Sequence, residues 1–375
     1  MRYLALLLAC MPLAAQRQVT HEQRPGLALS SGKVELVVLK QGGAFVEFTL
    51  SDDPKRINPM WDPIRMAREK GAQQRFGASA GHFVCVDGFG PISPEEQKAG
   101  YQSHGEANKL PWDTVQSTGM LLTQAVNLPI VHERYERTVR MAAGEQVVQV
   151  SAAIRSQLAF DRPMLWAEHG TIGAPFLKLG RTVVDQSTKQ CQTKPFSGPS
   201  RGNRTFPNAK NFIWPELPLD GTNLNLRVAP EQHGTMNHIG CLFDPDRATA
   251  FVTALNLDEN LLIGYLMPRQ DYPWIQHWMN YPENGTYSWG IEFGMQPYDM
   301  TKRDLYAMTP LFGADTFRWL PANSQVLTTY LMFLTRVPAG FQKVDDVRLE
   351  GGQLVIEDKK NGKRVALKST YGLEH

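Results

Sequence analysis

Residues 133–155 read ERYERTVRMAAGEQVVQVSAAIR and contain two strand-like runs in succession. In the first run, residues 133–142, successive side chains alternate between the two faces of an extended chain. The residues on one face are Tyr135, Arg137, Val139 and Met141. The second run, residues 146–155, is rich in valine, which is common in strands. This stretch predicts β-strands and not helices.

Strand signals recur along most of the chain. Two hairpin patterns are the runs 33–39 and 44–50 around Gly42-Gly43, and the run 347–367 around Asn361-Gly362. Further strand-like runs are residues 81–87, 119–128, 249–255, 286–295 and 325–334. Helical periodicity is rare, with one short helix expected after Pro63. The sequence predicts a single large, mainly antiparallel all-β domain over residues 31–372, preceded by a polar linker at residues 16–30.

The composition argues against several classes of protein. The chain has 375 residues, with 39 Lys and Arg against 37 Asp and Glu, so its formal net charge is +2. Since no run of basic residues occurs either, binding to nucleic acid through phosphate neutralisation is not expected. The sequence has no phosphate-binding glycine loop, no His-Glu-x-x-His helix and no Gly-x-Ser-x-Gly elbow.

Residues 1–15 have the pattern of a secretory signal. They carry one positive charge, then a short apolar core, then small residues. We expect export to the periplasm or the exterior, with cleavage near Ala15-Gln16. Leu7-Leu8-Ala9-Cys10 also resembles a lipobox, so a lipid anchor at Cys10 is one alternative and a cytoplasmic chain is another. No later segment reaches the roughly 18 uninterrupted apolar residues of a membrane span.

Three cysteines follow residue 15. Cys85, Cys191 and Cys241 fit no zinc-binding spacing. They allow either one disulfide with one free thiol or three buried thiols. His233 and His238 are close in the sequence but lack a convincing third ligand, so no metal site is expected.

Four motifs combine residue types that can carry chemistry. They are Ser103-His104-Gly105-Glu106 with Trp112 downstream, Trp166-Ala167-Glu168-His169-Gly170, Trp274-Ile275-Gln276-His277-Trp278 and Trp289-Gly290-Ile291-Glu292-Phe293-Gly294. A histidine beside a glutamate can be tuned toward a neutral pKa, and a partly buried glutamate can act as a base near neutral pH. Tryptophans among hydrogen-bonding groups suit a sugar. Each motif also has a structural interpretation: a surface turn, a core histidine, core packing and a solvent-facing glutamate, respectively.

Together the motifs resemble the aldose 1-epimerase (galactose mutarotase-like) family. His104-Gly105 with Trp112 is similar to the family's His-Gly motif and its downstream tryptophan. His169 is similar to its second histidine at the end of a strand, and Glu292 to its glutamate on a late strand. The three matches occur in the family's order, within a resemblance that spans about residues 32–337.

The resemblance implies a β-supersandwich with a sugar cleft on a concave sheet, and interconversion of the α and β anomers of an aldose. His169 would be the general acid at the ring oxygen, Glu292 the base on the C1 hydroxyl, and His104 a group that orients the sugar. No metal or organic cofactor is implied, and the partner is a small sugar or an oligosaccharide. The residues expected to bind it are Arg75, Trp112, Trp274, His277 and Trp278.

Two other functions stay open at this point. A carbohydrate-binding protein on the same fold would keep an aromatic cleft around Trp112, Trp274 and Trp278 without an aligned acid–base pair. A glycoside hydrolase or lyase would need two carboxylates about 5–10 Å apart. Such pairs would be Glu292 with Glu106 or Glu168.

Overall fold

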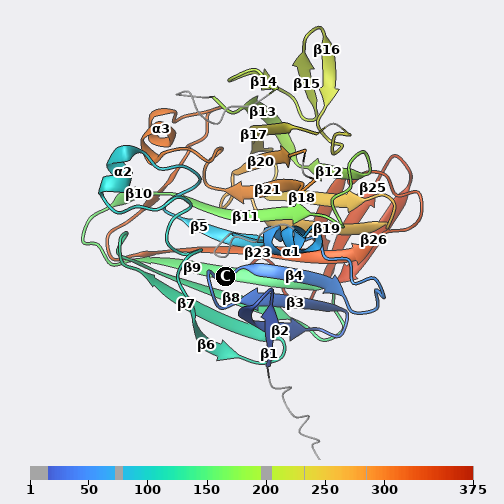
Figure 1. Cartoon of the computed structure of the whole chain (residues 1–375), viewed down its shortest axis with the longest axis horizontal. Helices are drawn as coiled ribbons and strands as arrows, with labels where there is room; N and C mark the ends of the chain where they lie inside the picture. The colour runs from blue at the N-terminus through green and yellow to red at the C-terminus, as the bar shows by residue number, and fades with distance from the viewer. Residues whose placement is uncertain (1–15, 72–78, 196–204, 232, 284, 375) are drawn as a thin grey trace, which may run out of the picture.

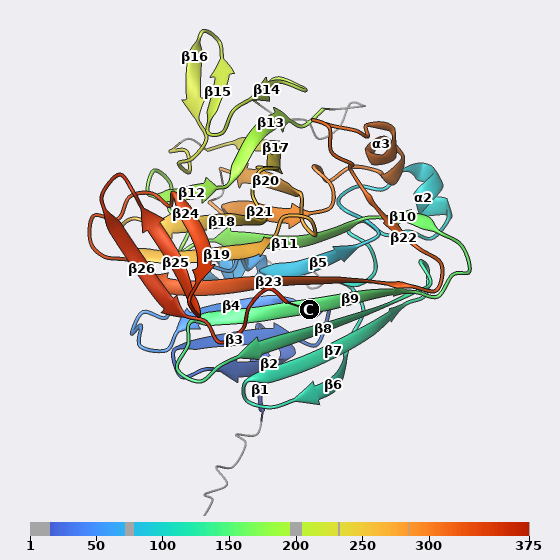
Figure 2. The same ribbon diagram turned by 180° about the vertical axis from the view of Figure 1, so that it is seen from behind.

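Two large antiparallel sheets lie face to face and form the body of the protein (Figures 1 and 2). The computed structural model describes residues 16–71, 79–195, 205–231, 233–283 and 285–374. Only three short helices occur in these residues. The predicted all-β supersandwich is therefore confirmed.

The first sheet has eleven strands. In their order across the sheet they are β1 (Arg17–His21), β2 (Arg24–Ser30), β3 (Val34–Leu39), β4 (Phe45–Leu50), β5 (His82–Val86), β11 (Trp166–Gly173), β21 (Ser288–Gly294), β20 (Trp274–Tyr281), β17 (Thr235–Phe243), β13 (Thr188–Thr193) and β14 (Asn211–Phe212). Strands that neighbour one another in its central part come from distant segments of the chain.

The second sheet has eight strands. They are β12 (Thr182–Gln186), β18 (Thr249–Asn256), β19 (Leu261–Pro268), β23 (Gln325–Arg336), β9 (Val147–Ser156), β8 (Glu133–Met141), β7 (Leu121–Leu128) and β6 (Asp113–Ser117). Three smaller sheets are β24 (Asp346–Glu350) with β25 (Gln353–Asp358) and β26 (Lys363–Lys368), β10 (Arg162–Met164) with β22 (Arg318–Leu320), and β15 (Glu216–Leu219) with β16 (Thr222–Asn225).

The hairpins expected from the sequence are present. β8 pairs with β9, and buried and partly exposed residues alternate along the whole of β8, as its sequence predicts. β3 pairs with β4, and β25 pairs with β26. The alternation of side chains therefore locates these strands correctly.

The helices are α1 (Pro63–Glu69), α2 (Pro94–Lys98) and α3 (Lys302–Ala307). The predicted helix after Pro63 is α1. Its N-cap residue is Asp62, whose side chain accepts hydrogen bonds from the backbone N–H groups of Ile64 and Arg65. α2 begins with a capping box between Ser93 and Glu96. Within the described residues, every helix is too short to span a membrane.

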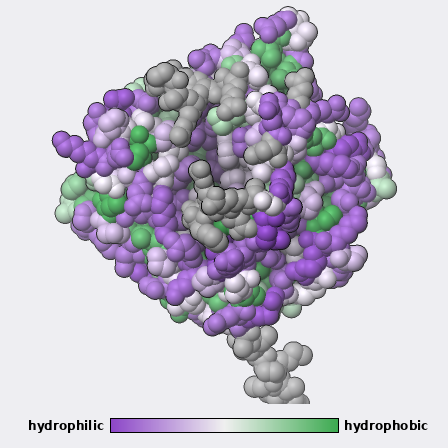
Figure 3. All heavy atoms as spheres, viewed as in Figure 1, coloured by the Kyte–Doolittle hydropathy of each residue, from purple (hydrophilic) through white to green (hydrophobic). Residues whose placement is uncertain are grey.

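The surface is mostly hydrophilic on the face that Figure 3 shows, and its hydrophobic residues lie in small separate groups. Among the described residues, the large apolar side chains with the most exposure are Ile213 at 63%, Phe160 at 61% and Trp319 at 57%. Single exposed apolar residues are ordinary on soluble domains. An exposed ring therefore suggests a binding site only where it borders a cavity.

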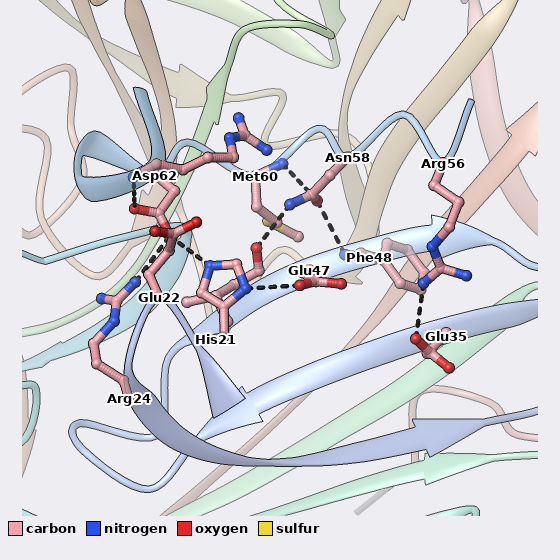
Figure 4. Close-up of polar contacts among 12 residues, drawn as sticks. His21, Glu22, Arg24, Glu35, Glu47, Phe48, Arg56, Asn58, Met60 and Asp62 are labelled. Carbon is pink, nitrogen blue, oxygen red and sulfur yellow. Dashed lines mark hydrogen bonds and ion pairs between the residues drawn. The ribbon is translucent and has the colours of Figure 1, made fainter. Parts of the chain in front are cut away.

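The predicted linker at residues 16–30 is wrong, because β1 and β2 form a hairpin that continues the first sheet. A charged cluster also ties this hairpin to α1 (Figure 4). His21 Nε2 lies 2.6 Å from Asp62 Oδ2, His21 Nδ1 lies 2.7 Å from Glu47 Oε1, and Arg24 donates to Asp62 at 2.8 Å. The polar residues that suggest a linker therefore have buried partners.

Candidate functional site

The alternation of side chains along β21 and β11 decides which residues leave the core. Phe293 packs against Tyr265 and Tyr330 of the second sheet, with ring centroids 5.2 Å apart in both pairs. Glu292, the preceding residue, therefore lies on the opposite face of the first sheet, which we call the site face. His169 of β11 lies on the same face, beside Glu292.

His169 and Glu292 form a close pair on the site face. His169 Nε2 lies 3.2 Å from Glu292 Oε1, but this contact lacks hydrogen-bond geometry, and Oε1 accepts no hydrogen bond from any described residue. Glu292 Oε2 accepts a hydrogen bond of 2.7 Å from Gln276 Nε2. Glu292 is 1% exposed and His169 is 5% exposed. One carboxylate oxygen is thus held in place, and the other is buried with no hydrogen bond from the described residues.

Burial shifts both pKa values in the direction of the uncharged forms. It raises the pKa of Glu292 well above its ordinary value, and the negative charge of Asp299 raises it further. Burial also lowers the pKa of His169 well below its ordinary value, with a smaller contribution from His104. Both shifts favour the uncharged carboxyl group and the uncharged imidazole.

His104 reaches the site from the loop between α2 and β6. Its φ is +61° and that of Gly105 is +73°, and a Cβ on Gly105 would lie 2.0 Å from Val86 O. The turn therefore requires this glycine. His104 Nδ1 accepts the N–H of Gly90 at 3.2 Å, and its ring centroid is 5.3 Å from that of His169. The ring proton consequently lies on Nε2, and burial lowers the pKa of His104 to about 4, so this group is a neutral donor.

Aromatic rings surround the histidines. Phe83 of β5 stacks on His169 with centroids 4.1 Å apart and planes 21° apart. The rings of Trp278 and His169 meet edge to face with centroids 6.3 Å apart, and those of Trp61 and Trp278 meet edge to face with centroids 5.7 Å apart. Of the tryptophans expected to bind a substrate, Trp278 is the one that lies beside the pair, and it is partly exposed.

A second group of polar residues, which sequence reasoning did not assign to the site, adjoins Glu292. Gln276 Oε1 accepts the backbone N–H of Asp299 at 2.6 Å. Lys194 Nζ donates to Asp299 O at 2.6 Å and also contacts the carboxylate. His238 Nε2 lies 3.6 Å from Asp299 Oδ2. Burial acts to raise the pKa of Asp299, but the charges of Lys194, His238 and His104 and the hydrogen bond from Lys194 together lower it.

Two of the residues expected to bind a substrate lie away from the pair. Trp112 is fully buried in the core, and its indole N–H donates to Ala107 O at 2.8 Å. His277 faces the core side of β20, where it contacts Gln186 Oε1 at 2.6 Å and accepts the Trp289 N–H at 3.0 Å. Neither side chain is available to a ligand on the site face.

The other two residues expected to bind a substrate, Trp274 and Arg75, cannot be placed beside the His169–Glu292 pair either. Trp274 shares its strand face with Gln276, but its ring is fully buried and its Nε1 donates to Asp315 O at 2.7 Å. Arg75 lies outside the described residues, as do the signal segment and Cys10.

The two carboxylates considered as partners of Glu292 in a hydrolase have partners within the protein. Glu106 Oε2 accepts the backbone N–H groups of Ile130 at 3.0 Å and Val131 at 3.3 Å. Glu168 faces the core and contacts His82 Nε2 at 2.9 Å. Both carboxylates are held by hydrogen bonds within the protein, and that of Glu168 lies on the core face of the sheet, opposite the site face.

The cysteines resolve into one disulfide and one free thiol. Cys191 of β13 is bonded to Cys241 of β17, which lies opposite it in the sheet. Cys85 is free and buried, with Sγ 3.4 Å from Nδ1 of His104. In the part of the chain that the structure describes, no group of three or more His, Cys, Asp or Glu side chains is arranged to hold a metal ion.

The fold has counterparts among solved structures. A putative aldose 1-epimerase from Klebsiella pneumoniae has a TM-score of 0.58 at 11% identity, over 86% of this chain and 88% of that one. A putative aldose 1-epimerase from Escherichia coli K12 has a TM-score of 0.57 at 14% identity, over 83% of this chain and 98% of that one. A galactose mutarotase related enzyme from Lactobacillus acidophilus has a TM-score of 0.57 at 11% identity, over 86% and 100%.

These likenesses establish the fold alone, because the identities are low. The chain has the galactose mutarotase-like fold. No family model matches the sequence, and neither does any curated protein sequence.

Proposed function

We propose that this protein is a carbohydrate-active enzyme that interconverts the anomers of a sugar by acid–base catalysis with histidine and glutamate. The observation that carries the proposal is the convergence of His104, His169 and Glu292 on one sheet face, with His169 Nε2 3.2 Å from Glu292 Oε1. Structures described as putative aldose 1-epimerases share the fold, which adds support.

The proposed reaction moves two protons. Glu292 takes the proton of the C1 hydroxyl while His169 gives a proton to the ring oxygen, and the C1–O5 bond breaks to form the open-chain aldehyde. Rotation about C1–C2 and the reverse transfers close the ring as the other anomer, so Glu292 is again ionised and His169 is again protonated. His104, which carries its proton on Nε2, donates a hydrogen bond that orients the sugar.

The catalytic forms require the proton of Glu292 to reside on His169. Burial opposes this transfer, because it favours both uncharged forms. A sugar hydroxyl that donates to Glu292 Oε1 would stabilise the ionised carboxylate, since this oxygen accepts no hydrogen bond from the described residues. Substrate binding would thereby create the acid and the base together.

A non-catalytic carbohydrate-binding protein is the second candidate. One observation favours it: His169 and Glu292 are almost fully buried, and their contact lacks hydrogen-bond geometry. A binding protein would use the same aromatic and polar face without proton transfer.

Mutarotation measured by polarimetry tests the proposal. We expect the purified protein to accelerate anomer equilibration of at least one freshly dissolved aldose, and Glu292→Gln to reduce kcat about 10²–10⁴-fold, the usual contribution of a positioned acid or base. Glu136→Gln is the matched control, because Glu136 is a partly exposed glutamate of β8. If no aldose is accelerated but sugars perturb tryptophan fluorescence, the binding function replaces the enzymatic one.

We also propose that the chain works in an oxidising compartment. The disulfide between Cys191 and Cys241 supports this, since such bonds persist mainly outside the reducing cytosol. Mass spectrometry of the protein isolated from its natural source, with and without reduction, would detect the bond. Two free thiols at these positions would contradict the proposal.

A further inference from the structure

A cavity of about 460 Å³ lies beside β22, and neither His169 nor Glu292 lines it. Residues that line it include Asp271, Asp315, Phe317, Arg318 and Trp319, and it contains no side chain of the proposed acid–base site. Its volume is in the range of small-molecule sites. In Figure 2 the ribbon of β10 and β22 lies at one side of the molecule, beside α2 and α3.

The cavity presents an exposed aromatic ring. Trp319 is 57% exposed, although a tryptophan ring has much apolar surface to bury. Phe317 contacts Trp319 edge to face, with centroids 5.7 Å apart and planes 80° apart. The backbone of Trp319 is paired with Pro163 of β10. The ring is therefore held by its neighbours but uncovered, as a stacking platform must be.

Polar groups of both hydrogen-bonding types surround this ring. Arg318 Nη1 lies 3.4 Å from Asp271 Oδ1, and the Asp271 carboxylate is almost fully buried. Asp315 adds a second acceptor, and Gln270 adds an amide that both donates and accepts. Two carboxylates against one guanidinium disfavour an anionic ligand, whereas hydroxyl groups can pair with every member of this set.

We propose that this cavity binds a neutral saccharide unit, separately from the acid–base site. The ligand would stack its apolar face on Trp319 and direct hydroxyls to Asp271, Asp315 and Arg318. Isolated exposed apolar residues need no special explanation, but this exposed ring borders a cavity that also contains matched donors and acceptors.

The cavity is also close to the proposed site along the chain. Met295, which lines the cavity, follows Glu292 by three residues, a span of about 10 Å in an extended strand. Trp274 of β20, two residues before Gln276, donates its indole N–H to the backbone oxygen of Asp315. The ends of β20 and β21 thus connect the two regions, so a saccharide bound in the cavity lies near the sheet that carries the acid–base pair.

Calorimetric titration of the full-length protein with maltohexaose, cellohexaose and mannohexaose tests this proposal. We expect at least one hexaose to bind, and Trp319→Ala to weaken its affinity about tenfold or more, as truncation of a central aromatic contact does. Arg318→Gln should weaken it as well. Phe160→Ala removes an equally exposed aromatic that does not line the cavity, and it should leave the affinity unchanged.

The outcome is independent of the proposed enzymatic function. Trp319→Ala should leave anomer equilibration of monosaccharides unchanged, and the hexaose affinity should persist in Glu292→Gln. Failure of all three hexaoses to bind, or equal affinity of the wild type and Trp319→Ala, would overturn the saccharide site without touching the acid–base assignment.

Discussion

Gln276 sets the properties of Glu292 through a single amide. Its Nε2 donates to Glu292 Oε2 while its Oε1 accepts the Asp299 N–H, so one side chain fixes both the carboxylate and the loop that carries Asp299. The hydrogen bond favours the ionised form of Glu292 and opposes the effect of burial on its pKa. Gln276 is therefore a positioning residue for the proposed base.

Gln276→Met should raise the pKa of Glu292 further, because it removes a donor to the carboxylate. A base that must be ionised then works only at higher pH, so the acidic limb of the kcat/KM profile should move to higher pH, with a loss of roughly tenfold at neutral pH. Polarimetry between pH 4 and 9 measures the profile. Gln190→Met, at an exposed position of β13, is the control, and an unshifted acidic limb would contradict the assigned role.

The titration of one residue, His21, should make the stability of the protein depend on pH (Figure 4). Burial acts to lower its pKa, but hydrogen bonds and charges from Asp62 and Glu47 together raise it to about 9. The charged form of His21 stabilises the folded state. This stabilisation is complete below pH 6.5, the pKa of His21 in the unfolded chain, and is lost as the pH rises through about 9, its pKa in the folded state. We expect the free energy of unfolding to fall by about 3 kcal/mol across this window.

Denaturant titrations at pH 6, 7.5 and 9.5 would measure this loss. His21→Gln should be less stable than wild type at pH 6 and should lack the decline. His132→Gln is the control for loss of an exposed histidine. A wild-type decline that persists in His21→Gln would assign the pH dependence to other groups.

The sequence predicts some site residues and misses others for a physical reason. His104, His169 and Glu292 stand in recognisable local motifs, and the structure places them together. Lys194 and Gln276 become neighbours of Glu292 only through the order of strands across the sheet, which no local pattern encodes. His277 illustrates the opposite error. It belongs to an aromatic motif that suggests a sugar site, but its side chain lies on the core face of β20.

At the scale of elements, the hairpin of β1 and β2 shows why a strand pair can escape prediction. Glu22 and Gln23 connect the strands with φ of 45° and 64°, a turn that Asn-Gly sequences usually make. Since neither residue is a usual turn former, the sequence carries no hairpin signal at this point. The hairpins at Gly42-Gly43 and Asn361-Gly362 contain glycine, and both are predicted correctly.

Gln23→Gly should stabilise this hairpin. Gln23 is exposed and has a left-handed backbone conformation, which costs a residue with a Cβ roughly 1–2 kcal/mol relative to glycine. We expect a net gain of about 1 kcal/mol, because glycine also gives the unfolded chain more freedom. Thermal melts would detect it. Gln18→Gly, at an exposed position inside β1, should be destabilising instead, and equal effects of the two variants would refute the turn assignment.

At the scale of the whole molecule, the aromatic cluster between the sheets should dominate stability. Phe293 is fully buried against Tyr265 and Tyr330, so Phe293→Ala should cost about 3–5 kcal/mol. Val115→Ala, at a position 56% exposed, should change the free energy of unfolding by less than about 0.5 kcal/mol. Urea unfolding followed by fluorescence measures both, and a small effect of Phe293→Ala would contradict close packing of the two sheets.

The strand order of the first sheet has a consequence for biosynthesis. The groups that meet around Glu292 come from β5, β11, β20 and β21 and from Asp299, so they are scattered over most of the chain. A ribosome must therefore have made nearly 300 residues before the last of them emerges. Until β11 is made, β5 has an exposed hydrogen-bonding edge, and β11 in turn lacks its second neighbour until β21 is made. Newly made chains consequently pass through a long interval in which they need protection from one another.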